Sequence, residues 1–464
     1  MKFGGTSVAS GENIRHIANL IANYVGQGYT IVTVVSASKG VTDELVEASK
    51  QAKNGNQDYI YEFKQKIVEK HLATARKAVG SKLILEEVER IIGATVDELE
   101  KVLTGIIYLG ELTLKSKDYV LSFGEKLSTP IVWGALRDLG LNAQHFTGKD
   151  AGIVTDSNFG EASPLMNVTK YEVRRKIEPL LEKGIIPVVT GYIAATQEGE
   201  TTTLGRGGSD YTATIIGATL DVDEIWIWTD VDGLMTSDPK IVASAKTLSE
   251  LSFQEATEMA ILEAKAMHPR ALEPAMEENI PLRIRNAFNP ERQGTLIVKE
   301  QGIKPGDVVK TITLVKDLAM VNVSGAGMVG TPGTAAKVFE VLGNDNINIL
   351  MISQSVSEAN ISFIILRSLL EGTVSKLEIA LLGRGLIREV TGEDDVCVVS
   401  VVGAGMKGTP GVASRVFTAI ARKGINIRMI AQGSSELNIS FVVKETDGEK
   451  AVRAIHEEFK LDKV

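Results

Sequence analysis

Two glycine-rich segments carry the residues best suited to chemistry in this chain of 464 residues. The segment at 2–8 reads Lys-Phe-Gly-Gly-Thr-Ser-Val, and the segment at 203–210 reads Thr-Leu-Gly-Arg-Gly-Gly-Ser-Asp. Each combines a cation, hydroxyl groups and glycines whose backbone N–H groups can face an anion. If the two segments converge, they form a site for a highly charged phosphate ester. Such a site favours phosphoryl transfer, which depends mainly on positioning and charge neutralisation.

Individual residues of these segments suggest specific roles. Lys2 can act as a point charge on a transferring phosphoryl group, and Arg206 is suited to bidentate pairing with a carboxylate or a phosphate. Ser209 begins a predicted helix, so its hydroxyl and the helix N-terminus can both face an anion. Asp210 could hold Lys2 in place or help to manage a metal-bound nucleotide. The alternative interpretation is a loop with a solvated lysine and an ordinary Ser-Asp helix cap.

Two further segments place carboxylates directly after predicted strands. The segment at 228–235 reads Trp-Thr-Asp-Val-Asp-Gly-Leu-Met, and its acids lie where a nucleotide ribose or a magnesium ion would sit. At 122–125, Ser-Phe-Gly-Glu, the carboxylate of Glu125 suits recognition of an ammonium group. An Asp-Gly turn without function, and a simple acid in the first turn of a helix, are the respective alternatives.

The elements that must position these segments alternate between strand and helix. Ser10 is predicted to cap a helix that ends near Gly26 and Gly28, and another helix is predicted over 127–139. Residues from about 42 to 117 are charged and poor in turn signals, which indicates a helical insertion. The predicted strands are 30–35, 119–123, 185–190 and 224–229. This alternation predicts an α/β sheet whose ligands bind at the carboxyl ends of the strands.

Beyond about residue 300, the sequence repeats at an offset of 78 residues. Gly-Ala-Gly-Met-Val-Gly-Thr-Pro-Gly at 325–333 matches 403–411, and Asn-Ile-Ser-Phe at 360–363 recurs at 438–441. Each copy is predicted to be a βαββαβ unit. Both turns fit the Gly-x-Gly-x-x-Gly dinucleotide pattern, but neither copy has the long βαβαβ context that such a site needs. A glycine-lined turn that admits a small ligand is favoured, and a purely structural turn is the alternative.

Composition excludes several functional classes. The net charge of −9 argues against nucleic acid as the main partner. No apolar run approaches the roughly 18 residues that a membrane span needs, and the N-terminus has no signal-peptide pattern, so no membrane association is expected. The single cysteine, Cys397, excludes an internal disulfide framework and favours a cytoplasmic location. The five histidines are scattered, which argues against a histidine-based metal site.

With these motifs and His-Pro-Arg-Ala at 268–271, the chain resembles the aspartate kinases of the amino-acid kinase superfamily over nearly its whole length. The resemblance implies an α/β amino-acid kinase fold, a central and mostly parallel sheet sandwiched by helices, at 1–300 with the insertion at about 42–117. The two βαββαβ copies look like ACT domains, which sense amino acids, at 301–390 and 391–464. Because no dehydrogenase segment follows, the chain resembles the monofunctional enzymes.

The family implies ATP-dependent phosphorylation of the L-aspartate side-chain carboxylate to 4-phospho-L-aspartate, the first step of lysine, threonine and methionine biosynthesis. Lys2 would stabilise the transferring phosphoryl group and Asp210 would organise it. The residues implied for aspartate are Ser36, Thr42, Glu125, Arg206 and Ser209. Those implied for ATP are Lys2, Gly4, Gly5, Thr6, Ser7, Thr229, Asp230, Met235, Lys240 and Lys265. Mg²⁺ would be held mainly by the ATP phosphates, with no metal-binding cluster in the protein. Met235 and Lys240 stand where the family usually has tyrosine and often has arginine.

The resemblance also implies regulation by lysine or threonine at the first ACT domain. The residues implied for this effector are Met328, Gly330, Thr331, Asn346, Ile347, Asn348, Gln354, Ser357 and Glu358. ACT domains of two chains would pair, so we expect a homodimer and consider a dimer of dimers. A kinase for glutamate or N-acetylglutamate is disfavoured because it lacks the paired ACT tail. The remaining alternative is a catalytically silent amino-acid sensor on a kinase scaffold, which intact Lys2, Arg206 and Asp210 disfavour.

Overall fold

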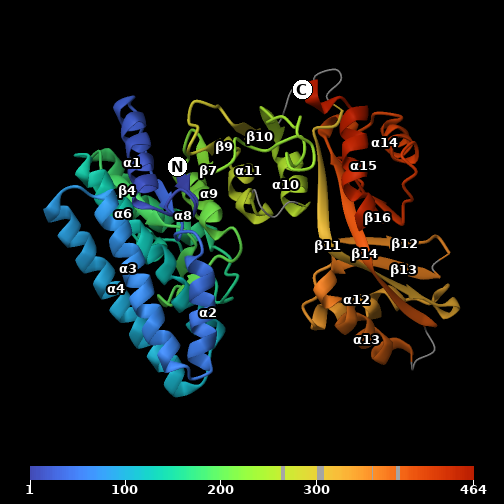
Figure 1. Cartoon of the computed structure of the whole chain (residues 1–464), viewed down its shortest axis with the longest axis horizontal. Helices are drawn as coiled ribbons and strands as arrows, with labels where there is room; N and C mark the ends of the chain where they lie inside the picture. Colours follow the sequence, from blue (N-terminus) through green and yellow to red (C-terminus); the bar gives the residue numbers. More distant parts are fainter. Residues whose placement is uncertain (263–266, 300–307, 358, 383–386, 464) are drawn as a thin grey trace. The chain divides into compact units, whose positions relative to one another are not determined.

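The computed structural model describes residues 1–262, 267–299, 308–357, 359–382 and 387–463. Backbone contacts divide these residues into two compact units, which Figure 1 colours along the chain. The first unit comprises Met1–Leu234, Ser249–Phe253 and Met267–Lys299. The second comprises Met235–Leu248 and the described parts of Gln254–Ala266 and Glu300–Val464. No helix in the described part of the chain is long and apolar enough to cross a membrane.

An eight-stranded sheet with the order β3-β4-β2-β1-β7-β9-β10-β8 forms the core of the first unit. Neighbouring strands run parallel except β9 and β10, which pair antiparallel. The two-residue strand β1 lies inside the sheet, where Lys2 pairs with Val34 and Ile227. The strands are β1 (Lys2–Phe3), β2 (Thr33–Val35), β3 (Ala143–Phe146), β4 (Ile186–Thr190), β7 (Ile225–Thr229), β8 (Glu250–Ser252), β9 (Leu282–Asn286) and β10 (Thr295–Val298). The carboxyl ends of β1, β2, β4 and β7 therefore meet at one edge.

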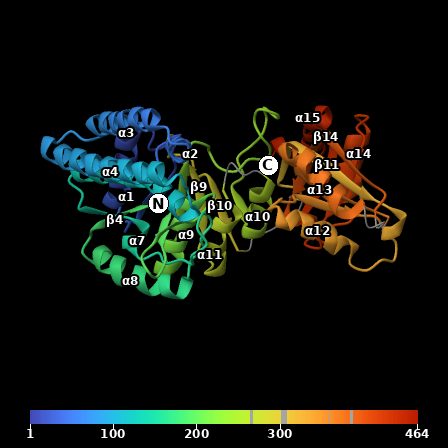
Figure 2. The ribbon, with the colours of Figure 1, turned by 90° about the horizontal axis from the view of Figure 1, so that it is seen from below.

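Helices cover both faces of this sheet. Helices α1 (Gly11–Gly26) and α6 (Phe123–Asp138) contact each other, and α8 (Met166–Glu182), α9 (Gly208–Leu220) and α11 (Glu273–Glu277) form a second contiguous group. Figure 2 shows α1 and α8 on opposite sides of the unit. As predicted, Ser10 caps α1, its hydroxyl accepting a hydrogen bond from the Asn13 amide at 3.2 Å. The unit also contains the short α7 (Gly148–Ala151) and a separate hairpin, β5 (Ile193–Ala195) and β6 (Thr201–Thr203). This arrangement confirms the predicted fold class.

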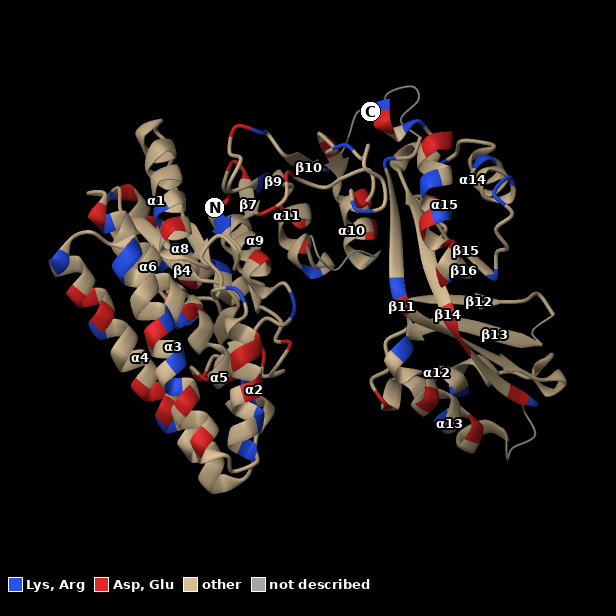
Figure 3. Ribbon diagram, in the orientation of Figure 1, with Lys and Arg blue, Asp and Glu red and all other residues tan. Residues whose placement is uncertain are grey.

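The charged stretch after β2 forms four helices: α2 (Val41–Lys53), α3 (Gln57–Ala78), α4 (Lys82–Leu109) and α5 (Leu114–Leu121). Each of the long helices α3 and α4 buries one apolar stripe and exposes the opposite face, as an amphipathic pattern requires. Ion pairs join them, with Lys64 Nζ 2.7 Å from Glu100 and Arg76 Nε 2.8 Å from Glu89. Figure 3 shows charges of both signs interspersed along these two helices.

The prediction of a strand at 119–123 is wrong. This stretch contains the end of α5 and the beginning of α6, and Thr113 caps α5 by accepting a hydrogen bond from the Ser116 amide at 3.1 Å. The run Tyr-Val-Leu-Ser-Phe is apolar and rich in strand-forming residues, but it is buried between neighbouring helices. Glu125 therefore follows a helix–helix junction and not a strand.

A six-stranded antiparallel sheet with the order β12-β13-β11-β14-β16-β15 forms the second unit, together with α10 (Phe253–Leu262). Each sequence copy contributes strand, helix, strand, strand and helix, which confirms the first five elements of the predicted βαββαβ pattern, but no sixth strand follows α15 among the described residues. The strands are β11 (Thr311–Ser324), β12 (Met351–Gln354), β13 (Asn360–Leu366), β14 (Glu389–Val402), β15 (Met429–Gln432) and β16 (Asn438–Lys444). The helices are α12 (Thr334–Asn344), α13 (Leu370–Leu381), α14 (Val412–Ala421) and α15 (Glu445–Glu458).

The two central strands of this sheet are shared between the sequence copies. β11 and β14 pair along nearly their whole lengths, from Thr311 with Val402 to Ser324 with Glu389. The second half of β11 pairs on its other side with β13, whereas the second half of β14 pairs with β16. The expected division between residues 390 and 391 falls inside β14, and the domain limits given above stay a prediction.

Candidate active site

A cavity of about 480 Å³ lies at the carboxyl ends of β1 and β2 in the first unit. It brings together seven of the predicted site residues, which come from five separate stretches of the chain. They are Lys2, Ser36, Thr42, Glu125, Arg206, Ser209 and Asp210. The segments at 2–8 and 203–210 therefore contribute to one cavity, which is the convergence that a phosphate-ester site requires.

Lys2 and Asp210 form a buried ion pair in this cavity. The Lys2 ammonium lies 2.6 Å from Oδ1 of Asp210, and the two residues are 8% and 9% exposed. Lys2 comes from the central strand β1 and Asp210 from the first turn of α9, which packs on that strand. A buried ion pair contributes little net stability, because desolvation offsets the attraction, but it fixes the position of both charges. The pair holds an ammonium group at the cavity wall.

Glu125 presents a buried carboxyl group from the first turn of α6. It is 4% exposed, and its Oε1 accepts a hydrogen bond from the Ala37 amide at 3.1 Å. Oε2 is buried and has no hydrogen-bond partner among the described residues. Burial raises the pKa of the Glu125 carboxyl from 4.5 to about 8, although the Ala37 amide and the Lys2 charge oppose this shift. A cation that binds beside Oε2 would favour loss of the Glu125 proton, which leaves this oxygen as an acceptor.

The loop at 4–7 folds tightly against the edge of the sheet. The Gly4 amide donates to the Trp228 carbonyl at 3.2 Å, and the Ser7 amide donates to the Gly4 carbonyl at 3.0 Å. A side chain at Gly5 would place its Cβ 2.9 Å from the Ala37 carbonyl oxygen, so this approach requires glycine. The Ser7 hydroxyl is buried without a partner among the described residues. The predicted nucleotide residues Gly4, Gly5, Thr6 and Ser7 thus lie beside the cavity at the end of β1.

The remaining predicted nucleotide residues are divided between the units. Thr229 is the last residue of β7, the strand beside β1, and its hydroxyl donates to the carboxylate of the following Asp230 at 3.3 Å. Met235 and Lys240 belong to the second unit, where the Met235 carbonyl accepts a hydrogen bond from Thr311 at 2.9 Å. Lys265 lies outside the described residues. Within the described ranges, no group of three or more His, Cys, Asp or Glu residues is placed to hold a metal ion.

Asp118 is a residue of this region that the sequence did not indicate. It is 1% exposed on α5, and its Oδ2 accepts hydrogen bonds from the amides of Gly160 at 2.9 Å and Thr203 at 3.0 Å. Its Oδ1 accepts a hydrogen bond from the Thr203 hydroxyl at 2.8 Å. Because Gly160 lines the cavity and Thr203 leads into the turn at 205–210, the Asp118 carboxylate fixes two parts of the wall.

Tyr192 is a second residue that the sequence did not indicate. It lines the cavity with a φ of 68°, a left-handed backbone that bulky residues rarely adopt. Its amide donates to the Thr212 hydroxyl at 2.9 Å and its carbonyl accepts from the Leu204 amide at 3.0 Å, which hold this conformation against α9 and the turn. The preceding Gly191 packs so closely on Ser209 that an added Cβ would lie 2.5 Å from the Ser209 Cβ. Both residues help to position the turn.

A cavity of about 310 Å³ in the second unit contains part of the predicted effector site. Of the predicted residues, Met328, Gly330, Thr331 and Gln354 line it, together with the turn at 332–335. Asn346, Ile347 and Asn348 precede β12 and do not line the cavity, and the Ser357 hydroxyl is 2.8 Å from that of Ser355. Glu358 lies outside the described residues.

Comparison with known proteins assigns the chain to a family. A family model described as the amino acid kinase family matches residues 1–286, and one described as ACT domain matches 321–381 and 399–459. Aspartokinase 1, chloroplastic, of Arabidopsis thaliana is 33% identical over 469 residues, which cover 99% of this chain and 79% of that protein. The chain belongs to the aspartokinases of the amino acid kinase family.

The chain is also similar to a longer, bifunctional protein and to crystal structures of aspartokinases. The bifunctional aspartokinase/homoserine dehydrogenase 1, chloroplastic, of Zea mays is 34% identical over 475 residues, and the chain spans 50% of its length. The crystal structure of E. coli aspartokinase III in complex with aspartate and ADP has a TM-score of 0.81 and 29% identity, covering 98% of both chains. The same E. coli enzyme with lysine and aspartate also has a TM-score of 0.81, with 27% identity.

Replacing Asp118 with alanine should loosen the cavity wall. The Gly160 and Thr203 amides would lose their buried acceptor, so we expect the free energy of unfolding of the first unit to fall by about 1–3 kcal/mol. Amide hydrogen exchange at these two residues should accelerate. Asp118→Asn is the matched control, because its oxygen can accept both amide hydrogens and its NH₂ can donate to the Thr203 hydroxyl. Equal effects of the two substitutions would contradict this role of the carboxylate.

Glu125→Gln should alter how stability depends on pH. Between pH 4.5 and 8 the unfolded chain releases the Glu125 proton while the folded protein retains it, so this residue makes stability fall as pH rises through that window. Glu125→Gln should therefore be more stable than the parent by roughly 3–5 kcal/mol above pH 8 and by little near pH 4.5. Denaturation is followed by tryptophan fluorescence, since Trp133, Trp226 and Trp228 all lie in the first unit. The exposed Glu86→Gln is the control, and a pH-independent difference would contradict the raised pKa.

Proposed function

We propose that this chain transfers the γ-phosphoryl group of ATP to the side-chain carboxylate of L-aspartate, which yields 4-phospho-L-aspartate and ADP. The observation that carries the proposal is the convergence of the Lys2–Asp210 pair, Glu125 and Arg206 on one cavity. The complex of E. coli aspartokinase III with aspartate and ADP supports it, because that enzyme shares the fold over 98% of this chain.

The cavity offers a complementary group for each polar end of aspartate. The guanidinium of Arg206 is exposed and suits bidentate pairing with the α-carboxylate. The Glu125 carboxylate would accept the substrate ammonium at Oε2, the buried oxygen described above. Ser36, Thr42 and Ser209 add hydroxyl donors to the same wall. In this arrangement the side-chain carboxylate of the substrate is directed toward Lys2.

Phosphoryl transfer would depend mainly on two things: the position of aspartate relative to the γ-phosphoryl group, and neutralisation of the charge on that group. A side-chain oxygen of aspartate attacks the γ-phosphorus, and the bond between that phosphorus and the oxygen bridging it to ADP breaks. The substrate carboxylate is already ionised near neutral pH, so no general base is required. The Lys2 ammonium neutralises charge on the transferring group, and Asp210 keeps that ammonium in place.

ATP would approach from the β7 side of the same sheet edge. Gly4, Gly5, Thr6 and Ser7 would face its phosphates with backbone and hydroxyl donors. Thr229, Asp230, Met235, Lys240 and Lys265 are proposed for the remainder of the nucleotide. The carboxylate of Asp230, directly after β7, is an oxygen ligand of the kind that Mg²⁺ takes, so the site fits a Mg²⁺ ion held mainly by the ATP phosphates, which would supply further charge neutralisation.

The second unit is proposed to carry feedback regulation by a product of the lysine, threonine and methionine pathway. Lysine or threonine would bind at the cavity that Met328, Gly330, Thr331 and Gln354 line, with Asn346, Ile347, Asn348, Ser357 and Glu358 completing the site. The lysine complex of E. coli aspartokinase III supports an amino-acid effector. Pairing of ACT domains in a homodimer, a dimer of dimers and a cytoplasmic location stay predictions, and the curated relatives named above are chloroplastic.

Lys2→Ala should abolish most turnover. Because it leaves the buried Asp210 carboxylate unpaired, the variant should also be less stable, so turnover is measured at a temperature where thermal denaturation shows it to be folded. Removing the ammonium that offsets transition-state charge should lower kcat by about 100–1,000-fold. Turnover is measured with ATP and L-aspartate, with hydroxylamine trapping the acyl phosphate as the hydroxamate. The control is Lys82→Ala, whose side chain is 91% exposed on α4. If a folded parent protein formed no aspartate-dependent hydroxamate, the silent-sensor alternative would replace this proposal.

Gln354→Ala should weaken inhibition and leave basal turnover nearly unchanged. Because Gln354 lines the effector cavity, we expect the lysine or threonine concentration for half-inhibition to rise about tenfold, which corresponds to roughly 1.4 kcal/mol of binding energy. Gln432→Ala is the matched control, since Gln432 occupies the same position in the second sequence copy. Identical inhibition curves for parent and Gln354→Ala would place the effector elsewhere.

A further inference from the structure

The sheet of the second unit has an apolar face on each side. Clusters on one face include residues of the helices α12, α13, α14 and α15. On the other face lies a cluster to which strands alone contribute, with Leu318, Met320, Met351, Val398 and Met429 among its buried members. The edge strands β12 and β15 contact each other, so the sheet folds over this second cluster. The cluster is therefore enclosed by the sheet itself.

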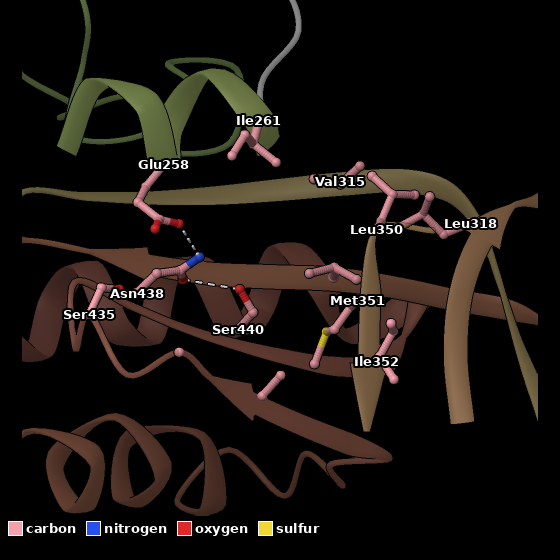
Figure 4. A pocket seen from close by; sticks show the side chains of 13 residues that line it. Glu258, Ile261, Val315, Leu318, Leu350, Met351, Ile352, Ser435, Asn438 and Ser440 are labelled. Carbon is pink, nitrogen blue, oxygen red and sulfur yellow. Dashed lines mark hydrogen bonds between the residues drawn. The ribbon is translucent and has the colours of Figure 1, made fainter. Parts of the chain in front are cut away.

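A cavity of about 270 Å³ opens where this enclosed cluster ends (Figure 4). Its apolar wall includes Val315, Leu318, Leu350, Met351 and Val398. Helix α10 adds Ile261, whose side chain points toward Val315 and Leu350 in Figure 4. The wall can accept an aliphatic group, and the volume limits the ligand to a small molecule. None of the described residues predicted for the regulatory amino acid lines this cavity.

The opposite part of the cavity is polar and includes the carboxylate of Glu258. The Asn438 amide NH₂ donates to the Glu258 carboxylate at 3.1 Å, and the Asn438 oxygen accepts a hydrogen bond from the Ser440 hydroxyl at 3.0 Å. These bonds orient the amide of Asn438 and aim its NH₂ at Glu258 (Figure 4). Among the described residues that line the cavity, Glu258 is the one that carries a charge. A carboxylate beside an apolar wall, with a neutral amide as its partner, favours a cationic ligand group.

We propose that this cavity binds a small aliphatic primary ammonium compound. Its ammonium group pairs with Glu258, and its aliphatic chain packs on Val315, Leu318 and Met351. Aliphatic α-amino acids share this chemistry, and their carboxylate would lie toward the exposed rim at Gly433 and Ser435. The site is separate from the proposed effector cavity and does not depend on the proposed catalytic function.

Isothermal titration of the full chain with 3-methylbutylammonium chloride tests the proposal. We expect saturable binding of one molecule per chain, and no saturable binding of 3-methylbutanoate, which has the same branched chain and the opposite charge. L-leucine forms a further arm: tighter binding than the amine identifies an amino acid as the ligand, and weaker binding identifies a simple amine. Lack of saturation by the amine at millimolar concentration, or equal binding of 3-methylbutanoate, would overturn the proposal.

Variants separate the carboxylate from general effects of charge. Glu258→Gln should weaken binding of the amine at least tenfold, whereas Glu340→Gln, the same change at an exposed position on α12, should leave it unchanged. Ile261→Lys is a second variant at a position that is 50% exposed and three residues from Glu258 on α10, so its ammonium should compete with the ligand. Unchanged affinity in folded Glu258→Gln or Ile261→Lys protein, with folding checked by thermal denaturation, would refute the site.

Discussion

The buried ion pair between Lys2 and Asp210 is the constraint on which the first unit depends. An ammonium group inside a parallel sheet is tolerated only beside a compensating carboxylate, because an isolated buried charge is costly. Strand β1 supplies the cation and the first turn of α9 supplies the anion. The ion pair therefore fixes the position of α9 relative to the sheet. The two-residue length of β1 is sufficient because β2 and β7 both hold it.

Two of the carboxyl groups that line the cavity, those of Asp210 and Glu125, differ in state. Asp210 is paired with a cation, whereas Glu125 receives one backbone hydrogen bond and has a pKa near 8. The empty cavity therefore holds a fixed ion pair beside a neutral acid over much of the physiological range. An ammonium ligand would draw out the Glu125 proton and create a second ion pair. The cavity is thus suited to a zwitterion. The ligand's ammonium group would pair with Glu125, and its carboxylate would pair with Arg206.

The motifs at 2–8 and 228–235 could be placed from the sequence because they stand at the ends of parallel strands, whose carboxyl ends meet at one edge. Their convergence follows from β1 lying beside β7 and under α9. The strand predicted at 119–123 is wrong because a short, mostly apolar run does not distinguish a strand from a buried helix. The sequence does not indicate Asp118, because a lone carboxylate carries no pattern and its partner Thr203 is 85 residues away. Its importance is visible only once the chain is folded.

The shared strands β11 and β14 change what the internal repeat means. Although the sequence reads as two successive modules, each half of the sheet borrows a strand segment from the other copy. A fragment ending at the repeat boundary would cut β14 in two and leave part of β11 with an unpaired edge, which invites aggregation. The two sequence copies therefore form one folded unit. Removing or replacing either copy would take away strand partners that the other copy needs.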